Sequence, residues 1–557
     1  MKIRWKPSQG QYGSKDHRWV FMLINIAVVI LGVLYYYGLQ LAFYPDAEDL
    51  YAIWSCYKSI KYGMNYHSYD FMAGFINYLS AVIGGMSFFA LRLSFTLMHA
   101  VILICTWYLA ICFGHKDRHN IYILPVFIWF AIALHPATEA DPYGWISDYG
   151  TDYIYQWPYN YHWVARIYAL ICLIIVALYV SAESRKKKRI LAVVGVIVTL
   201  YAASQKDLIF FLLFLVPFFI VFGLRSMKDA VKRKWVIYFL GICMLGVLMT
   251  KYVPSGIRSV LWSTEEAHTY GEIYGATNWL SLDMIWTTIV NYCTNVMGYF
   301  TVLLPESPIV SLYTVVYGVK LVLLAIGYCI VFQIIRYSIN GNAAGLNITI
   351  VDEILAWSYA ALSASLILTA YGYNVMYTAR YGTGLVTVMS ILLCRHLTDF
   401  VKSACGMNDV FRKHEKALLS FCILALCLCS MKKVWSFEAH TYHDDDMEAV
   451  IEYIRANDLG YAVASWYFAP SFTAMSQGDV IVCNSIDEVQ SLYGEDAKIT
   501  YMITRYDHAG GQYHDYLYYE NFEDYEDVCD KYSEPSYVID YDSFSLCVWE
   551  DGLKIQQ

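Results

Sequence analysis

Long apolar segments separated by short polar ones fill most of this chain. From Trp19 to about Met431, apolar runs of about 20 residues recur, and runs of this length are typical of helices that cross a membrane. A membrane-spanning barrel would instead show short strands in which polar and apolar residues alternate. The pattern therefore predicts a polytopic α-helical membrane protein.

The charged residues between the apolar runs predict which side of the membrane each loop faces. Lys and Arg gather in the tail 1–18, in Arg185–Arg189 and in Arg225–Lys234, and the positive-inside rule places such segments in the cytoplasm. Alternation between these segments predicts about eleven spans and a cytoplasmic N-terminus. It also predicts a first outer loop at 42–84 and a second outer loop at 135–163.

The transmembrane domain is expected to cover residues 19–431. Its first and third spans are predicted at about 19–41 and 121–134, and its fifth span is predicted to end at Ser204–Asp207. The eighth to eleventh spans are predicted at about 315–335, 354–371, 385–393 and 417–431. The stretch 282–304 fits either a surface helix or a span. We count it as non-spanning, because the charged loops that follow then fall on the expected sides.

The composition changes near Phe437, where the long apolar runs end. Three Asp residues precede apolar residues at helical spacing from Met447 to Ile454, as expected of a helix with acidic residues at its N-terminus. Short strand-like stretches follow at Tyr461–Ser465, Val480–Cys483, Ile499–Ile503, Tyr537–Ile539 and Leu546–Trp549. The region 437–557 is therefore predicted to be a small extracytoplasmic α/β domain.

The first outer loop contains an amphipathic pattern. Apolar residues recur at helical spacing from Leu50 through Ile53 and Trp54 to Tyr57. This spacing predicts a helix from about Asp49 to Ile60 that lies on the membrane surface.

The composition indicates a membrane protein and argues against some kinds of partner and ligand. Hydrophobic residues make up 58% of the chain and charged residues 16%, compared with about 25% charged residues in a soluble domain. The net charge of −9 argues against nucleic acid as a partner. Fifteen cysteines are present, but no C-x-x-C pair or zinc-like spacing appears, so no metal site is predicted from them.

Three carboxylates stand directly after the first predicted span, at Asp46, Glu48 and Asp49. Charges next to a bilayer are costly, so a cluster of this kind is a functional hypothesis by default. The alternative is an ordinary polar loop whose acidic residues cap the helix that follows.

The order of several motifs resembles the polytopic C-type glycosyltransferases (the GT-C superfamily), which include protein O-mannosyltransferases and lipid A aminoarabinose transferases. The acidic motif Asp46–Asp49 is followed by a Gly- and aromatic-rich stretch, Ile83–Leu93, that ends in Arg-Leu. A later span ends in small residues and a lysine, at Ala202–Lys206, and Ala379–Gly382 places Arg-Tyr at the start of a late span. The resemblance covers the membrane portion in outline.

This resemblance implies a glycosyltransferase that moves a sugar from a polyprenyl-phosphate donor to a glycan, lipid or protein acceptor at the outer face of the cell membrane. It implies that Asp46 is the general base, with Glu48 and Asp49 as the alternative carboxylates. No cofactor is required, although carboxylates of this kind also suit Mg²⁺ or Mn²⁺, which some relatives bind.

The resemblance also implies residues that bind the substrates. Glu139 and Asp141, on the second outer loop, would orient the acceptor or the sugar. Lys206 and Arg380, with the adjacent Tyr381, would hold the lipid phosphate, since an Arg fork donates two parallel hydrogen bonds to phosphate oxygens. Long basic side chains at span ends also fit simple anchoring at the membrane interface.

Two other classes of protein act on lipid-linked sugars. A transporter or flippase would carry charges near the bilayer centre and related halves, and few mid-span charges and no repeat are visible in the sequence. A polysaccharide polymerase or ligase would use Arg and His residues of the outer loops. The acidic cluster in the first outer loop favours the transferase.

Overall fold

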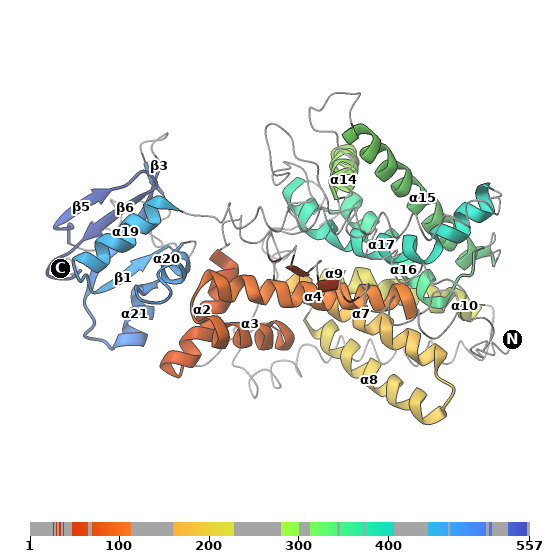
Figure 1. Cartoon of the computed structure of the whole chain (residues 1–557), viewed down its shortest axis with the longest axis horizontal. Coiled ribbons are helices and arrows are strands. Elements are labelled where there is room, and N and C mark those ends of the chain that lie inside the picture. Colours follow the sequence, from red (N-terminus) through yellow and green to blue (C-terminus); the bar gives the residue numbers. More distant parts are fainter. Residues whose placement is uncertain are drawn as a thin grey trace. The chain divides into compact units, whose positions relative to one another are not determined.

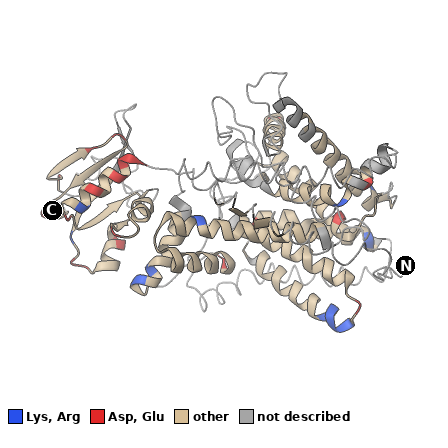
Figure 2. Ribbon diagram, in the orientation of Figure 1, with Lys and Arg blue, Asp and Glu red and all other residues tan. Residues whose placement is uncertain are grey.

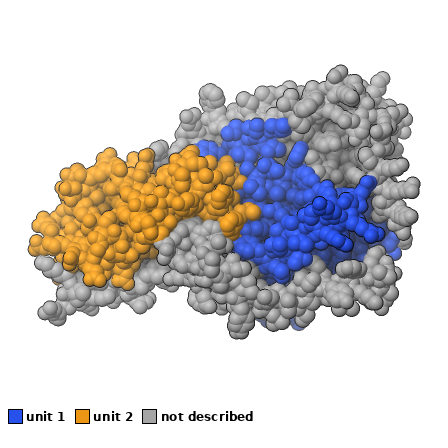
Figure 3. Space-filling model, turned by 90° about the horizontal axis from the view of Figure 1, so that it is seen from below, with its two compact units in different colours: residues 1–40, 98–261, 266–439 blue, residues 41–97, 262–265, 440–557 orange. Residues whose placement is uncertain are grey.

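The computed structural model describes most of the apolar helices and the C-terminal α/β region. It describes isolated positions between 26 and 37 and the ranges 47–64, 70–112, 160–205, 207–227, 280–299, 312–341, 346–370, 375–405, 444–465, 468–507, 512–514 and 533–553. The chain divides into two compact units (Figure 3). Unit 1 comprises residues 1–40, 98–261 and 266–439, and unit 2 comprises 41–97, 262–265 and 440–557.

Unit 1 is helical throughout the residues that the structure describes in it (Figure 1). It contains the second part of α4 (Phe88–Cys112), α7 (Asn160–Ser181), α8 (Arg185–Ser204), α9 (Leu208–Phe210), the π-helical turn η2 (Phe211–Leu215), α10 (Val216–Met227), α14 (Ile285–Tyr299), α15 (Leu312–Asn340), α16 (Ile350–Leu368) and α17 (Val375–Cys405). Figure 2 shows how few charged residues these helices carry apart from the basic start of α8.

Five helical segments are long and apolar enough to cross a membrane, namely Phe88–Ala110, Trp163–Ser181, Leu208–Ser226, Leu321–Asn340 and Ile350–Leu368. Their mean hydropathy lies between 1.4 and 2.6. They confirm the expected class of apolar, helical membrane protein and match five of the predicted spans.

Other expected spans differ in detail. The predicted fifth span is the helix α8, whose first five residues are basic, and the predicted tenth contributes a shorter apolar segment, Gly384–Leu397, within α17. The stretch counted as non-spanning holds α14, whose 15 residues extend about 22 Å, less than the roughly 30 Å of a bilayer core. The spans expected at 121–134 and 417–431, and most of the one at 19–41, lie outside the described residues.

Close contacts define the relative directions of three helices in unit 1. Ser358 Oγ on α16 donates to the Leu213 carbonyl at 2.6 Å, and Arg225 at the end of α10 pairs with Glu353 at the start of α16. Segment η2–α10 therefore runs antiparallel to α16. Helix α17 is also antiparallel to α16, because a Cβ on Gly384 would lie 3.1 Å from a methyl of Leu362, whereas Arg395 contacts Asp352.

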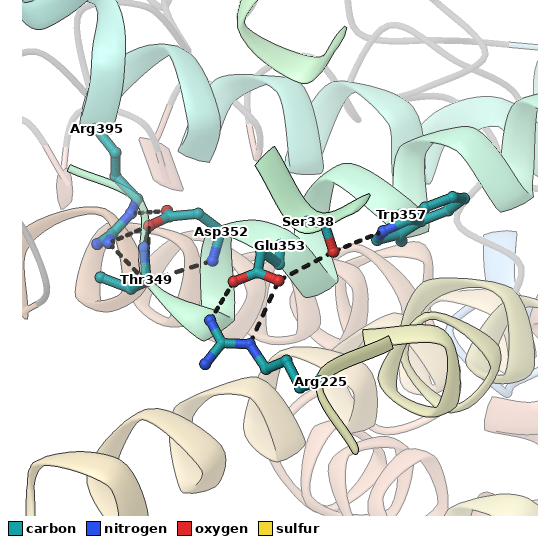
Figure 4. A network of polar contacts seen from close by, with 7 residues as sticks. All are labelled: Arg225, Ser338, Thr349, Asp352, Glu353, Trp357 and Arg395. Atoms are coloured by element: carbon teal, nitrogen blue, oxygen red, sulfur yellow. Dashed lines mark hydrogen bonds and ion pairs between the residues drawn. The ribbon is translucent and has the colours of Figure 1, made fainter. Parts of the chain in front are cut away.

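Adjacent carboxylates at the start of α16 connect this helix to four others (Figure 4). Asp352 pairs with Arg395 of α17, whose Nη1 also donates to the Leu109 carbonyl of α4 at 3.1 Å. Glu353 pairs with Arg225 of α10 and accepts from Ser338 Oγ of α15 at 3.0 Å.

The Asp352 carboxylate is also part of the N-terminal cap of α16. The Thr349 backbone N–H donates to Asp352 Oδ2 at 2.7 Å, and His396 Nε2 lies 3.2 Å from Oδ1. The side chains of Asp352, Arg395 and His396 are almost completely buried, so the ion pair of Asp352 and Arg395 lies in a surrounding of low dielectric constant. This network holds the neighbouring helices together at one end of the bundle.

Unit 2 combines three helices from the start of the chain with the C-terminal α/β region. The helices are α2 (Ala47–Tyr62), α3 (Phe71–Gly84) and the first part of α4. The α/β region contains α19 (Asp445–Ala456), β1 (Tyr461–Ala464), α20 (Ala469–Met475), β2 (Val482–Cys483), α21 (Ile486–Tyr493), β3 (Ile499–Asp507), β4 (Gln512–His514), β5 (Tyr537–Asp540) and β6 (Phe544–Val548).

The strands form one mixed sheet in the order β2-β1-β3-β6-β5, with β4 paired to β3. Strands β2, β1 and β3 are parallel, whereas β6 pairs antiparallel with both β3 and β5. Residues of α19 and α20 share a core with one face of the sheet, and Val489 of α21 shares a core with the other. The structure confirms all five predicted strands and adds β4, which the sequence analysis missed.

The network predicts a marked loss of stability when Arg395 is replaced by Met. The change leaves the Asp352 carboxylate buried without its guanidinium partner, and breaking a buried pair in this way costs about 3–5 kcal/mol. Thermal denaturation of the purified protein in detergent should show a clearly lower midpoint. The matched control is Arg336→Met, which removes an exposed arginine from α15 of the same unit.

The double variant Asp352→Asn/Arg395→Met distinguishes the pair from the packing of Arg395. It removes the uncompensated charge and should recover a large part of the lost stability. A midpoint equal to that of Arg395→Met would show that the ion pair is not what stabilises this end of the bundle.

Candidate functional site

The acidic motif leads into a regular helix. Asp46 lies outside the described residues, whereas Glu48 and Asp49 belong to the first turn of α2, with side chains that are not described. The predicted helix in this loop is confirmed and extends from Ala47 to Tyr62. Negative charges in a first helical turn interact favourably with the helix dipole, so capping and a chemical role are compatible here.

The apolar face of α2 is buried in protein. Leu50 and Ile53 are fully buried, Trp54 is 1% exposed, and the helix packs against α3 and α20. The expectation that this face lies on the membrane surface was wrong. An amphipathic helix needs an apolar partner of any kind, and here α3 and the C-terminal region supply it.

One carboxylate of the C-terminal region binds two residues of α2. Trp54 Nε1 donates to Glu488 Oε1 at 2.9 Å, and Lys58 Nζ forms an ion pair with the same oxygen. The other oxygen, Oε2, accepts from the Asn484 backbone N–H at 2.8 Å, and the Glu488 N–H donates to Ser485 Oγ at 3.1 Å. Glu488 is thus held at the start of α21, with both carboxylate oxygens in hydrogen bonds or ion pairs.

Tyrosines extend this contact along α2. Tyr62 Oη lies 3.3 Å from Tyr493 Oη, and burial together with this hydrogen bond raises the pKa of Tyr493. The Tyr493 ring stacks on Tyr461 of β1, with centroids 4.1 Å apart. The Tyr57 hydroxyl raises the pKa of Lys61, so Lys61 stays charged.

A glycine of positive φ lies under Tyr57. Gly478 has φ +83°, and a Cβ at this position would lie 2.8 Å from Tyr57 Oη. The turn after α20 therefore approaches α2 more closely than a larger residue would permit. Together with Glu488, it fixes α2, and with it the acidic first turn, on the C-terminal region.

The segment that carries Lys206 joins α8 to α9. Lys206 lies outside the described residues, but Gln205 ends α8 and Asp207 caps α9 by accepting from the Ile209 N–H at 2.8 Å. The π-helical turn η2 follows directly, and turns of this type are frequent at functional sites.

The residues predicted at the start of α17 approach the same end of unit 1. Arg380 and Tyr381 belong to α17, with side chains that are not described. One turn further on, Gly384 packs so closely that a Cβ would lie 3.1 Å from a Leu213 methyl. Segment α9–η2–α10 and helix α17 are both antiparallel to α16, so both begin at the end of the bundle opposite the Asp352 network.

A third segment reaches that end. The Leu280 N–H donates to the Leu368 carbonyl at 3.1 Å, and Thr288 Oγ1 donates to the Ile367 carbonyl at 2.6 Å, which places the start of α14 beside the end of α16. The charge pattern predicts that this end faces outward, since Arg225 and Arg395 are at the other. Glu139 and Asp141, from the second outer loop, lie outside the described residues.

The described residues contain no group of three His, Cys, Asp or Glu side chains that could hold a metal ion. In the C-terminal region Cys483 and Cys547 are buried free thiols, and burial raises the pKa of the Cys483 thiol well above its usual range. Both cysteines therefore act as small apolar core residues.

Sequence reasoning missed the residues that hold these elements. Lys58 and Glu488 are 430 positions apart, and no local pattern links them. Asp352 did carry a signal, because Thr349-Ile350-Val351-Asp352 has the capping-box spacing and the structure contains that box. Its pairing with Arg395 had no signal of this kind.

Comparison with known proteins does not assign the chain to a family. No family model and no characterised protein matches it.

The Glu488 contact predicts that α2 loosens when this carboxylate is removed. Glu488→Ala leaves Lys58 and Trp54 without their shared acceptor and should weaken the attachment of α2 by about 3 kcal/mol, which speeds amide exchange there roughly 100-fold. Glu488→Gln, which keeps an acceptor for Trp54, should have a smaller effect. Hydrogen–deuterium exchange of residues 47–62 measures both, with the exposed Glu495→Ala as control. Unchanged exchange in Glu488→Ala would contradict the attachment.

Alanine substitutions at two glycines of positive φ can distinguish the effect of backbone strain from the effect of the contact with Tyr57. Gly478→Ala and Gly494→Ala should each lose about 1–3 kcal/mol of stability, because a positive φ strains the backbone of alanine. A Cβ at Gly494 meets nothing within 4 Å, whereas one at Gly478 displaces Tyr57. Only Gly478→Ala should accelerate amide exchange in α2, and Tyr57→Phe should partly reverse that effect. Equal exchange in the two alanine variants would show that Tyr57 does not depend on this glycine.

Proposed function

We propose that the protein is an integral membrane glycosyltransferase that transfers a sugar from a polyprenyl-phosphate donor to an acceptor at the outer face of the cell membrane. The observation that carries the proposal is the fixed position of α2. Glu48 and Asp49 belong to the first turn of a helix that contacts to Glu488 hold in place, and a rigid element directly after Asp46 in the chain supports the motif's role as a base.

The proposed reaction uses one carboxylate of the motif as general base. Asp46 takes the proton from an acceptor hydroxyl while that oxygen bonds to the anomeric carbon of the donor sugar. The bond between the anomeric carbon and the phosphate oxygen breaks, and its electron pair leaves with the lipid phosphate. Glu48 and Asp49, in the first turn of α2, are the alternative bases.

The leaving phosphate needs positive charge where its negative charge develops. Lys206 and Arg380 are the proposed ligands, and Tyr381 is their proposed neighbour. The directions of α9–η2–α10 and α17 support this assignment, since both segments begin at one end of unit 1. The N-terminal turn of α17 adds the positive end of a helix dipole.

We also propose a multi-pass topology and residues that bind the acceptor or the sugar. The five apolar helices support a multi-pass protein. We propose about eleven spans, a cytoplasmic N-terminus and an extracytoplasmic C-terminal region, as the loop charges indicate. Glu139 and Asp141 are proposed to orient the acceptor or the sugar, and Mg²⁺ or Mn²⁺ would bind through carboxylate oxygens.

A flippase of lipid-linked sugars is the second candidate. The buried Asp352 and Glu353 are the feature in its favour, because acidic residues inside a membrane domain often mark transport pathways. Both are neutralised by arginines at a helix end, however, which supports a structural role.

The test is transfer of radiolabelled sugar from a panel of polyprenyl-phosphate sugars by the purified protein in liposomes. Asp46→Asn should lower the transfer rate by about 10²–10⁴-fold, as loss of a general base does. Arg380→Ala should lower it by about 10²–10³-fold, with partial activity in Arg380→Lys. The control Glu452→Gln, an exposed carboxylate on α19, should transfer normally.

If transfer persists in Asp46→Asn but is lost in Asp49→Asn or Glu48→Gln, the general base is Asp49 or Glu48 rather than Asp46. Movement of labelled carrier across the liposome bilayer without sugar transfer would contradict the proposal and favour the flippase.

A further inference from the structure

Helix α3 exposes a continuous apolar stripe. Phe71, Phe75, Tyr78, Leu79, Val82 and Ile83 follow one another at helical spacing and are each 40–59% exposed. The helix has 14 residues, begins at the N-cap Asp70 and ends at Gly85, whose φ is +64°. A stripe of this size on one helix needs an apolar partner.

The opposite face of α3 packs on protein. Its buried residues are Ala73, Gly74, Ile76, Asn77, Ser80 and Ala81. Asn77 Oδ1 accepts a hydrogen bond from Ser94 Oγ of α4, and α2 packs against the same helix. The orientation of α3 in unit 2 is therefore set by its small and polar side chains.

The division of side chains between the two faces identifies the partner. Helix–helix contacts in membranes favour small residues such as Gly, Ala and Ser, which let backbones approach closely. Four of the five such residues in α3, Ala73, Gly74, Ser80 and Ala81, are buried on the face packed against protein, and Gly84 at the end of the helix is half-buried, while the exposed face carries large aromatic and branched side chains. This arrangement fits lipid acyl chains better than a second protein helix.

The surrounding sequence supports the same partner. Residues 71–91 contain no Asp, Glu, Lys, Arg or His. Only three residues separate α3 from α4, whose apolar part starts at Phe88, and Phe89 in its first turn is 45% exposed, so the apolar surface continues onto a candidate span. The 14 residues of α3 reach about 21 Å, too short to cross a hydrocarbon core of roughly 30 Å.

We propose that the stripe Phe71–Ile83 of α3 is embedded in the acyl chains of the bilayer without crossing it. Helix α3 then anchors unit 2 to the membrane. Because α2 packs on α3, the same contact holds the acidic first turn of α2 close to the level of the lipid headgroups. The anchoring does not require that the protein transfers sugars.

The experiment places the photo-crosslinking amino acid p-benzoylphenylalanine at Phe75 or Val82 of the full-length protein in phosphatidylcholine liposomes. Ile104, exposed on the apolar part of α4, is the lipid-facing reference, and Glu452, exposed on α19, is the solvent-facing control. After irradiation, mass spectrometry counts covalent lipid adducts. Adducts at Phe75 and Val82 should match those at Ile104 and exceed those at Glu452 at least about tenfold.

Two other results would overturn the proposal. Covalent dimers through Phe75 or Val82 would show that a second copy of the chain covers the stripe. Few adducts at both positions, with normal lipid adducts at Ile104, would show that the stripe lies outside the hydrocarbon. Both substituted proteins should elute from size exclusion as the wild type does, since each replaced side chain is more than half exposed.

Discussion

Charges in apolar surroundings have to be neutralised, and this requirement organises the helical bundle. Asp352 and Glu353 are adjacent in the chain, so their side chains leave α16 in different directions and reach two different arginines. Through Arg395, Arg225 and Ser338 they fix α17 and the ends of α10 and α15 around the start of α16 (Figure 4). Because these positions cannot change independently, the opposite ends of the same helices are also constrained. That opposite end is where the segments beside Lys206 and Arg380 begin.

Unit 2 depends on a second constraint of the same kind, acting over a much longer stretch of chain. Glu488 and Lys58 are 430 residues apart, so their contact closes a loop that contains most of the protein. Loop closure costs entropy that grows only slowly with length, and the burial of Leu50, Ile53 and Trp54 contributes the hydrophobic stabilisation that offsets it. The C-terminal region is therefore the structural support of α2.

Local patterns allowed the elements to be predicted, but not their partners. Short strand-like stretches located each strand of the C-terminal sheet except β4, and long apolar runs located five candidate spans. The spacing of Leu50, Ile53 and Trp54 showed that α2 needs apolar cover, but spacing cannot distinguish lipid from protein, so the expected partner was wrong. Pairs such as Asp352–Arg395 and Lys58–Glu488 form only in the tertiary structure, and no local sequence pattern indicates either pair. The assignment of Asp46, Lys206 and Arg380 stays a prediction from motif order.

The two faces of α3 carry different kinds of side chain, and this difference indicates what each face packs against. Residue size and polarity separate its faces: the buried face combines small residues such as Gly74 and Ala81 with Asn77 and Ser80, whereas the exposed face carries large apolar side chains. The same criterion explains Gly327 of α15 and Gly384 of α17, whose missing side chains allow Met389 and Leu213 to approach. At these two glycines a neighbouring helix packs closely. The large side chains on the exposed face of α3, by contrast, would keep a second helix backbone at a distance. A helix with this division is suited to face lipid on one side and to hold α2 on the other.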